Sequence, residues 1–246
     1  MAQYKRIISL VPSLTELLID LGLKERLAGR TRFCVHPEDQ VEDIPIIGGT
    51  KNPRLDKIKK ADPDFILANK EENRREDIEE LAEDYPVHVT DIASIEDALI
   101  TIYEIGNIFN QTGKAMQMMN QIAGLLHARP DEPPIRTAYL IWREPWMTVG
   151  GDTYIHDVMD HWELNNVFED QKRYPKITLE ELKRQRPELV LLSSEPFPFK
   201  EKHLPEVEER LPDVRVLLVD GEWFSWYGSR MVSSFKKLNT WRKAIS

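Results

Sequence analysis

Residues 6–22 read RIISLVPSLTELLIDLG, and the order of apolar and polar residues in this stretch decides the fold class. The run from Arg6 to Leu10 is short, apolar and rich in isoleucine, which is typical of a buried strand. Ser13 and Glu16 form a capping-box pattern, which predicts a helix that begins at Ser13. Leucines then recur on one helical face until Gly22 can end the helix: Leu14, Leu17, Leu18 and Leu21. The stretch therefore predicts a strand followed at once by a helix.

The same alternation of strand and helix continues along the chain. Short apolar runs predict further strands at 27–31, 44–47, 64–68, 86–90, 136–142, 188–193 and 214–219. Apolar periodicity predicts helices at 55–61, 74–83, 94–109, 112–128, 154–162, 178–185, 201–210 and 228–243. Residues 129–134 contain three prolines and divide this pattern into two halves. We therefore predict an α/β fold with two Rossmann-like α/β lobes, at 1–93 and 134–246, and a helical segment at 94–128 that includes a bridging helix.

The composition excludes several classes of protein. The 246 residues include 33 Lys and Arg against 42 Asp and Glu, a net charge of −9, whereas nucleic-acid binding needs a basic face. Cys34 is the only cysteine, so no disulfide can form within the chain. An apolar fraction of 41% is enough to build a core, which excludes a disordered chain.

The N-terminal residues indicate in which cellular compartment the protein is expected. Its apolar run is short and stops at Pro12, unlike a secretory leader, and no cysteine stands near the start for a lipid anchor. No run approaches the roughly 18 apolar residues of a membrane span, so the protein is predicted not to be membrane-embedded. The sequence as given predicts a cytoplasmic protein, or a periplasmic or surface-anchored one if a leader has been removed.

Candidate binding residues follow the predicted strands, because ligands of open α/β sheets lie beyond the carboxyl ends of the strands. The loops at these ends carry more Arg, Lys, Asn and Trp than turns require. Aromatic rings with a few polar groups suit a large, partly apolar ligand. The predicted ligand-binding residues are Ser13, Arg32, Phe33, Thr50, Lys51, Asn52, Asn69, Lys70, Trp146, Trp223, Phe224, Trp226, Tyr227 and Arg230.

Five basic residues on these loops leave two alternatives open. Charge-assisted hydrogen bonds could bring an anionic ligand to Arg32, Lys51, Lys70, Arg143 and Arg230. Each of these side chains could instead pair with a nearby carboxylate, for which the candidates are Glu71, Glu72, Glu144 and Glu222.

The tryptophans all follow the proline-rich break, and their surroundings differ. Trp142 ends an apolar strand and is predicted to lie in the core. Trp223 and Trp226 stand in a loop that contains Gly221 and Gly228, where a core position is less favoured. We predict that Trp223 and Trp226 face the ligand.

Motifs for metal binding and catalysis are missing from the sequence. Cys34 and His36 form a Cys-x-His pair, and His156 and His161 are five residues apart, neither of which is the spacing of a zinc site. We predict no metal site, and Cys34 is interpreted as a small buried residue. Because no Gly-x-Ser-x-Gly elbow, Walker loop or GxGxxG motif follows a strand, we predict no catalytic residues.

The ordered set of short motifs resembles the class III substrate-binding proteins of ABC importers, which receive vitamin B12, siderophores and haem. The resemblance begins in residues 6–16 and 21–29 and continues in 55–58 and 62–67, which match the family's LExIxxLxPDLVI segment. The second half adds matching stretches at 149–152, 164–168, 177–182 and 186–190. Trp223 and Phe224 stand where the cobalamin-binding members place an aromatic pair. The resemblance extends from about residue 5 to about residue 240 and is closest to the cobalamin-binding type.

The resemblance implies a fold and a function. Two α/β lobes would be bridged by a helical backbone, with the ligand in a cleft between them. The protein would be a non-enzymatic binder of a corrinoid such as cobalamin, or of a related metal chelate, without a catalytic cofactor. Its partners would be that small ligand and an ABC permease that docks on surface glutamates. Two alternatives remain: a cytosolic member of the fold that binds a small anionic metabolite as carrier, sensor or accessory protein, and a cytosolic enzyme that uses the cleft loops.

Overall fold

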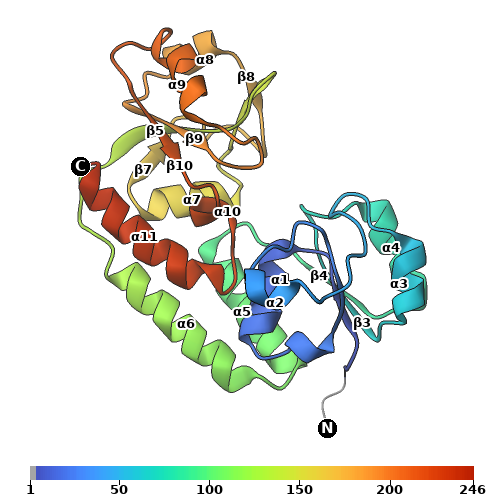
Figure 1. Cartoon of the computed structure of the whole chain (residues 1–246). Coiled ribbons are helices and arrows are strands. Elements are labelled where there is room, and N and C mark those ends of the chain that lie inside the picture. The colour runs from blue at the N-terminus through green and yellow to red at the C-terminus, as the bar shows by residue number, and fades with distance from the viewer. Residues whose placement is uncertain (1–3) are drawn as a thin grey trace. The chain divides into compact units, whose positions relative to one another are not determined.

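The computed structural model describes residues 4–246, in which the chain forms two units (Figure 1). Unit 1 contains the chain up to Ile92, residues Glu96–Gln121 and residues Tyr227–Arg230. Unit 2 contains Ala93–Ile95, Ile122–Trp226 and Met231–Ser246. Each unit has its own sheet, which confirms the predicted α/β fold with two lobes. The helical segment predicted at 94–128 is divided between the units, and its role as a bridge stays a prediction.

Unit 1 is built on a parallel sheet of four strands in the order β2-β1-β3-β4. The strands are β1 (Ile7–Ser9), β2 (Leu27–Arg30), β3 (Phe65–Asn69) and β4 (Val87–Thr90). Its helices are α1 (Pro12–Asp20), α2 (Glu38–Val41), α3 (Leu55–Ala61), α4 (Arg75–Asp84), nearly all of α5 (Ile95–Ile108) and the part of α6 (Thr112–His127) up to Gln121, with a 3-10 turn at Lys24–Arg26. Because the strands are parallel, all their carboxyl ends lie at one edge of the sheet.

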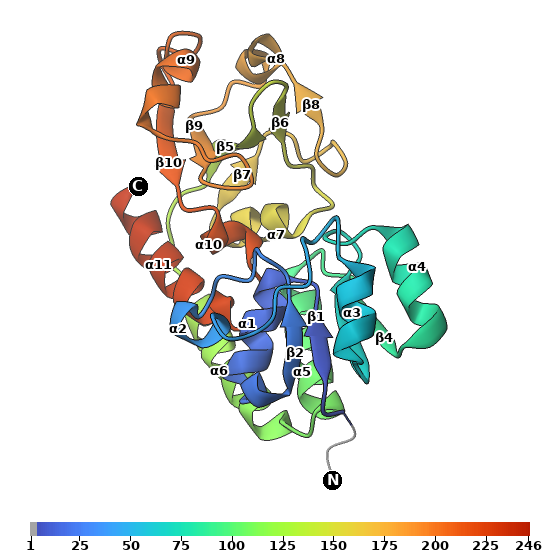
Figure 2. The ribbon, with the colours of Figure 1, turned by 45° about the vertical axis from the view of Figure 1, so that its right-hand side comes forward.

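Both faces of this sheet are covered (Figure 2). On one face, Ile8 and Ile66 of the strands pack with Ile58 of α3 and Leu81 of α4. Successive strand residues point to opposite faces, so Phe65 faces the other way. The Phe65 ring lies 5.1 Å from the ring of Phe109, directly after α5. This double coverage explains why the two central strands, β1 and β3, are fully buried and largely apolar, whereas the edge strand β4 carries His88 and Thr90.

Unit 2 contains a mixed sheet of six strands. Its strands are β5 (Ile135–Trp142), β6 (Trp146–Thr148), β7 (Leu164–Asn166), β8 (Lys176–Ile177), β9 (Leu189–Ser193) and β10 (Arg215–Val219). The order is β10-β9-β5-β6-β8, and β7 pairs with β5. β9 and β7 are parallel to β5, β10 is parallel to β9, and β6 is antiparallel to both β5 and β8. The helices are α7 (Tyr154–His161), α8 (Leu179–Arg184), α9 (Leu204–Glu208), α10 (Glu222–Ser225) and α11 (Arg230–Ala244), with a 3-10 turn at Glu201–His203.

Helices cover both faces of the unit 2 sheet as well. On one face, Leu140 and Val190 of the strands pack with Leu182 of α8 and Val207 of α9. On the other face, the ring of Tyr139 lies 5.1 Å from the ring of Phe224 in α10. The segment of α10 is therefore anchored in the core directly at the carboxyl end of β10.

Most predicted elements are present, and the differences have local causes. The helix predicted from Ser13 begins at Pro12, with Val11 as its N-cap and no side-chain cap, so the capping box is wrong. Proline fits the first helical position because it lacks an N–H that would need a partner there. The strand predicted at 44–47 is reduced to a bridge between Arg30 and Ile46. The short elements α2, β6, β7, β8 and α10 were not predicted from the sequence.

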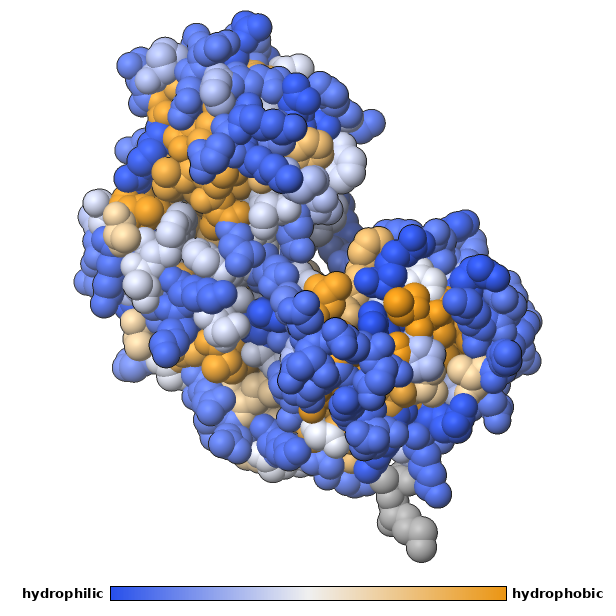
Figure 3. Space-filling view, in the orientation of Figure 1, coloured by the Kyte–Doolittle hydropathy of each residue, from blue (hydrophilic) through white to orange (hydrophobic). Residues whose placement is uncertain are grey.

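The surface of each unit is largely hydrophilic, with separate apolar patches (Figure 3). The most exposed large apolar side chains within residues 4–246 include Phe33 at 51%, Val35 at 47% and Trp142 at 39%. The core position predicted for Trp142 is therefore wrong. Trp142 is the last residue of β5, and its ring packs edge-on against Phe197 at 5.7 Å while another part remains in solvent. Over the same residues, no helix combines the length and apolar character needed to cross a membrane.

Candidate functional site

The carboxyl edge of unit 1 brings three loops together around Asn73. The amide nitrogen of Asn73 donates to the carbonyl oxygens of Leu10, at 3.2 Å, and Thr50, at 3.0 Å. Its amide oxygen accepts from the backbone N–H of Asn69 at 2.8 Å. Asn73 thus links the loops that follow β1 and β3 to the segment around Thr50. The sequence analysis did not select Asn73, although it stands in the loop that contains Asn69.

Asn69 itself is part of this internal framework. It is 1% exposed, and its amide oxygen accepts from the backbone N–H groups of Glu71 and Glu72. Its amide nitrogen donates to the carbonyl and hydroxyl oxygens of Thr90. Two other predicted ligand residues are also buried, Ser13 at 5% and Thr50 at 9% exposure. These three side chains shape the edge from within unit 1, and ligand contact through them stays a prediction.

A group of exposed residues gathers around Gly49 at the same edge. A Cβ atom placed on Gly49 would lie 2.3 Å from the amide oxygen of Asn52, 3.3 Å from the Phe33 ring and 3.5 Å from Nε of Arg32. A side chain at position 49 would require the Asn52 amide to move, and the contacts to Phe33 and Arg32 show how closely these two side chains approach the backbone. The Arg32 guanidinium lies 5.6 Å from the centre of the Phe33 ring. The structure therefore brings together predicted ligand residues from two loops, with a half-exposed ring beside a cation.

Arg230 is held in a buried ion pair inside unit 1. Its Nε lies 2.9 Å from one carboxylate oxygen of Glu16, and its Nη2 lies 2.8 Å from the other. The two side chains are 15% and 10% exposed. Burial raises the pKa of the Glu16 carboxyl, and the charge and hydrogen bond of Arg230 offset only part of that rise. Two of the three guanidinium nitrogens of Arg230 are thus engaged by Glu16 within the protein.

The other basic candidates divide into paired and unpaired side chains. Lys70 pairs with Asp91, and Arg143 pairs with Glu206 at 2.7 Å and with Glu144 at 2.9 Å. Lys51 donates to the backbone carbonyl of Glu71. No carboxylate within residues 4–246 forms an ion pair with Arg32 or Lys51. Lys70, Arg143 and Arg230 are therefore paired. Arg143 has a predicted partner in Glu144, but Lys70 pairs with Asp91 and Arg230 with Glu16, neither of which was predicted.

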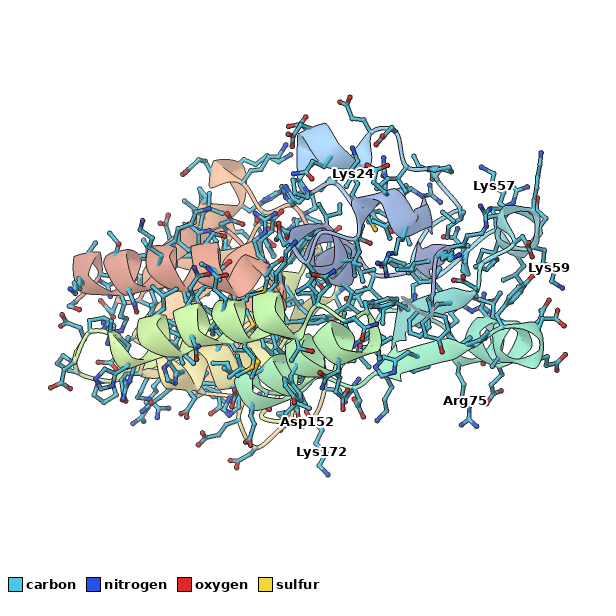
Figure 4. The ribbon with its side chains drawn as sticks, turned by 90° about the horizontal axis from the view of Figure 1, so that it is seen from below. Lys24, Lys57, Lys59, Arg75, Asp152 and Lys172 are labelled. Atoms are coloured by element: carbon cyan, nitrogen blue, oxygen red, sulfur yellow. The ribbon has the colours of Figure 1, made fainter. Side chains whose placement is uncertain are left out.

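Basic residues on the helices lie elsewhere. Lys57 and Lys59 of α3 and Arg75 of α4 point outward into solvent in Figure 4. Lys59 is 3.7 Å from Glu80, and Arg75 is 2.6 Å from Glu79. These pairs belong to a solvated helix surface and contribute little to stability.

The aromatic candidates of unit 2 differ in accessibility. Trp146 is half-buried and stacks on Phe199 with ring centres 5.9 Å apart. Trp223 is also half-buried and carries the Lys237 ammonium 5.6 Å from its ring centre. Phe224 is completely buried against Tyr139, so it is a core residue in this structure. Tyr227, which belongs to unit 1, is 7% exposed.

Glu195 is a functional candidate that the sequence analysis missed. It follows β9 at the carboxyl edge of unit 2, and its Oε1 accepts from the Trp226 indole N–H at 2.9 Å and from the Ser225 hydroxyl. Burial raises the pKa of the Glu195 carboxyl, Glu222 and Asp220 raise it further, and the two hydrogen bonds partly offset this. The only sequence signal was a carboxylate directly after a buried apolar strand.

Cys34 is buried in unit 1. It is 0% exposed, which confirms its interpretation as a small buried residue, and the Thr15 hydroxyl donates to its sulfur at 3.1 Å. Burial raises the pKa of the thiol, which disfavours a reactive thiolate. Among residues 4–246, no group of three or more His, Cys, Asp or Glu side chains could hold a metal ion.

Comparison with known proteins adds a family and a fold. The model of the family described as "Periplasmic binding protein" matches residues 7–213. The vitamin B12-binding protein of Vibrio campbellii is 23% identical over 195 residues, which cover 77% of this chain and 70% of that protein.

Solved structures show the same fold at low sequence identity. The periplasmic vitamin B12-binding protein of Vibrio cholerae superposes with a TM-score of 0.83 at 18% identity, covering 98% of this chain and 97% of that one. The periplasmic haem-binding protein of Roseiflexus sp. RS-1 also gives a TM-score of 0.83, at 16% identity and 98% coverage of both chains. The resemblance predicted from the sequence motifs is confirmed, and the fold is common to receptors of different ligands.

Proposed function

Because the chain belongs to the periplasmic binding protein family, we propose that it is the substrate-binding protein of an ABC importer and that its ligand is a corrinoid such as cobalamin. The curated relatives that support this ligand are vitamin B12-binding proteins. The fold alone does not select the ligand, because haem-binding proteins superpose equally well. The choice therefore depends on the side chains at the two carboxyl edges.

The observation that favours a corrinoid is the pairing of three of the five basic candidates. Haem carries two propionate carboxylates, and many ferric siderophores are anionic, so both call for unpaired cations. Here Lys70, Arg143 and Arg230 are each neutralised by a carboxylate of their own unit. A corrin ring is edged with neutral amide side chains, whose N–H groups need hydrogen-bond acceptors and whose carbonyl oxygens need donors, neither of which has to be charged.

The accessible groups suit such a ligand. Phe33 in unit 1 and Trp226 in unit 2 offer aromatic surface, which packs against a large ring. Glu195 offers a carboxylate acceptor to amide N–H groups. Each of these side chains lies at the carboxyl edge of the sheet in its own unit.

A thermal-shift series tests the ligand. Cyanocobalamin, cobinamide, haemin, a ferric catecholate siderophore and inorganic anions are added separately to the full chain. A ligand at 100 times its Kd stabilises the fold by about 2.7 kcal/mol, and each kcal/mol raises the Tm of a chain of this size by about 2–4 °C. We expect a shift with the corrinoids. A shift with haemin or the siderophore and none with the corrinoids would refute the proposed ligand.

One observation favours a second candidate, a small anionic ligand. Arg32 and Lys51 form no ion pair with any residue between 4 and 246, so two positive charges remain at the edge of unit 1. If an anion alone produces the shift, and an Arg32→Ala/Lys51→Ala double variant abolishes it, the cytosolic anion-binding alternative replaces the corrinoid. Turnover of a bound compound would instead support the enzyme alternative.

The proposed partner is an ABC permease that binds surface glutamates. Exposed glutamates are present on both units, for example Glu79 on α4 and Glu208 on α9. Ligand-dependent stimulation of a reconstituted importer's ATPase would identify that partner. Charge reversal of the exposed glutamates on one unit at a time would then locate the contact.

A further inference from the structure

The carboxylate of Glu195 combines two features at the carboxyl edge of unit 2. Its Oε1 accepts from the Trp226 indole and from the Ser225 hydroxyl, whereas its Oε2 accepts no hydrogen bond from residues 4–246. Oε2 has no hydrogen-bond partner in that part of the chain but is not fully buried, so part of its surface remains accessible. One oxygen therefore holds an aromatic side chain, and the other is open to a ligand.

The surroundings keep this arrangement in place. A Cβ atom on Gly221 would lie 2.5 Å from Cγ of Glu195 and 2.4 Å from the Ser193 hydroxyl, so the backbone before α10 packs directly on the loop of Glu195. The Ser225 hydroxyl, which bonds to Glu195, also donates to the Gly221 carbonyl at 2.9 Å. Because Trp226 follows Ser225 directly, the loop after β9 fixes the indole.

The charge around Glu195 is negative. The titratable groups that act on it are Glu222 and Asp220, both carboxylates, and no lysine or arginine within the described chain forms an ion pair with it. Asp220 uses one oxygen to accept from the backbone N–H of Glu222 at 3.1 Å. These carboxylates can accept hydrogen bonds from a ligand and would repel an anionic group.

We propose that Glu195 is a specificity-determining residue of unit 2, which positions the indole of Trp226 and accepts an amide N–H of the ligand while its charge excludes a carboxylate. This role rests on the corrinoid function proposed above. An amide and a carboxylate have nearly the same shape, but an amide offers an N–H donor where a carboxylate offers a second acceptor oxygen. The site would therefore select an amide-bearing ring over a carboxylate-bearing ring by chemistry rather than by size.

Calorimetric titrations at neutral pH test this selection. The probes are cyanocobalamin and its monocarboxylic acid derivatives, in each of which one side-chain amide is hydrolysed. We expect the wild-type chain to bind at least one derivative about tenfold or more weakly, in the range that separates a satisfied from an unsatisfied buried hydrogen bond. Glu195→Gln keeps an acceptor for the indole and removes the charge. It should lose most of the discrimination between cyanocobalamin and these derivatives.

Two further variants separate positioning from charge. Glu195→Ala removes the acceptor, so it should weaken cyanocobalamin binding and change the near-ultraviolet circular dichroism of the tryptophans, whereas Glu195→Gln should restore that signal. Asp213→Asn, before β10, removes an exposed carboxylate of the same unit and should behave as wild type.

Equal discrimination by wild type and Glu195→Gln would overturn the selection. An unchanged spectrum and unchanged affinity in Glu195→Ala would overturn the positioning role. Failure of the wild-type chain to bind any corrinoid would refute the proposed function itself, and this role with it.

Discussion

Replacing Arg230 with alanine distinguishes a structural side chain from a ligand contact. The substitution leaves the Glu16 carboxylate, whose side chain is 10% exposed, without both of its charged hydrogen bonds at 2.8 and 2.9 Å. Removing one partner of a buried pair costs about 3–5 kcal/mol, because the remaining charge stays out of water. We therefore expect the free energy of unfolding to fall by about that amount.

The measurement is urea unfolding followed by two probes. Far-ultraviolet circular dichroism reports on both units, whereas tryptophan fluorescence reports on unit 2, because all six tryptophans lie there. The loss should appear in the circular dichroism midpoint at an unchanged slope. A Glu16→Gln/Arg230→Met double variant, which removes both charges, should recover much of it. Arg75→Ala, which removes a side chain that is 86% exposed, should stay within about 0.5 kcal/mol of wild type.

The opposite pattern would refute this reasoning. If Arg230→Ala unfolds at the wild-type midpoint but binds ligand about tenfold more weakly, Arg230 is a ligand contact as the sequence first predicted. An equal loss in the double variant would show that the pair is not coupled.

Three further perturbations follow from local geometry. Gly151→Ala should lower the Tm by an amount equivalent to about 1–3 kcal/mol, because the added Cβ would lie 2.2 Å from the Glu169 carbonyl oxygen. The control Gly124→Ala, whose Cβ would meet nothing within 4 Å, should be neutral or stabilising, and equal Tm values for the two variants would contradict this. Asn73→Ala should cost about 2 kcal/mol or more in urea unfolding, since two buried carbonyls lose their donor, and an unchanged midpoint would show that water replaces it. Because the pKa of Glu195 is raised, the folded chain binds the carboxyl proton more tightly than the unfolded chain does. The resulting stability is present below the unfolded pKa of about 4.3 and is lost as the pH rises through the folded pKa. Unfolding measured across this pH range should be flatter in Glu195→Gln, and identical profiles would argue against the shift.

Periodic patterns predicted the long elements because those patterns are set by local sequence. The helix at Leu55–Ala61 begins and ends where its apolar spacing predicted. Strands β3 and β9 are mainly apolar and fully buried, because both faces of each sheet are covered. Short elements were missed: β8 has two residues, too few to show a period. The start of α1 was misplaced because Pro12 competes with Ser13 for the helix N-terminus, and nothing in the sequence ranks a proline at N1 above a capping box.

The position of the candidate loops was predictable, but the burial and pairing of their side chains were not. Knowing where strands end was enough to find the loops that carry Arg32, Phe33 and Trp226. Side-chain burial was not predictable, because it depends on tertiary packing: Phe224 is enclosed by Tyr139, a residue 85 positions earlier in the chain. The same limit hid the pairing of Arg230, whose carboxylate partner is 214 residues away.

The most direct test of the central claim is a calorimetric titration of the full chain with cyanocobalamin, beside haemin under the same conditions. The pairing of the basic side chains and the acceptor at Glu195 predict saturable binding of cyanocobalamin, and much weaker binding of haemin with its two carboxylates. Tight binding of haemin with no heat from cyanocobalamin would contradict the account.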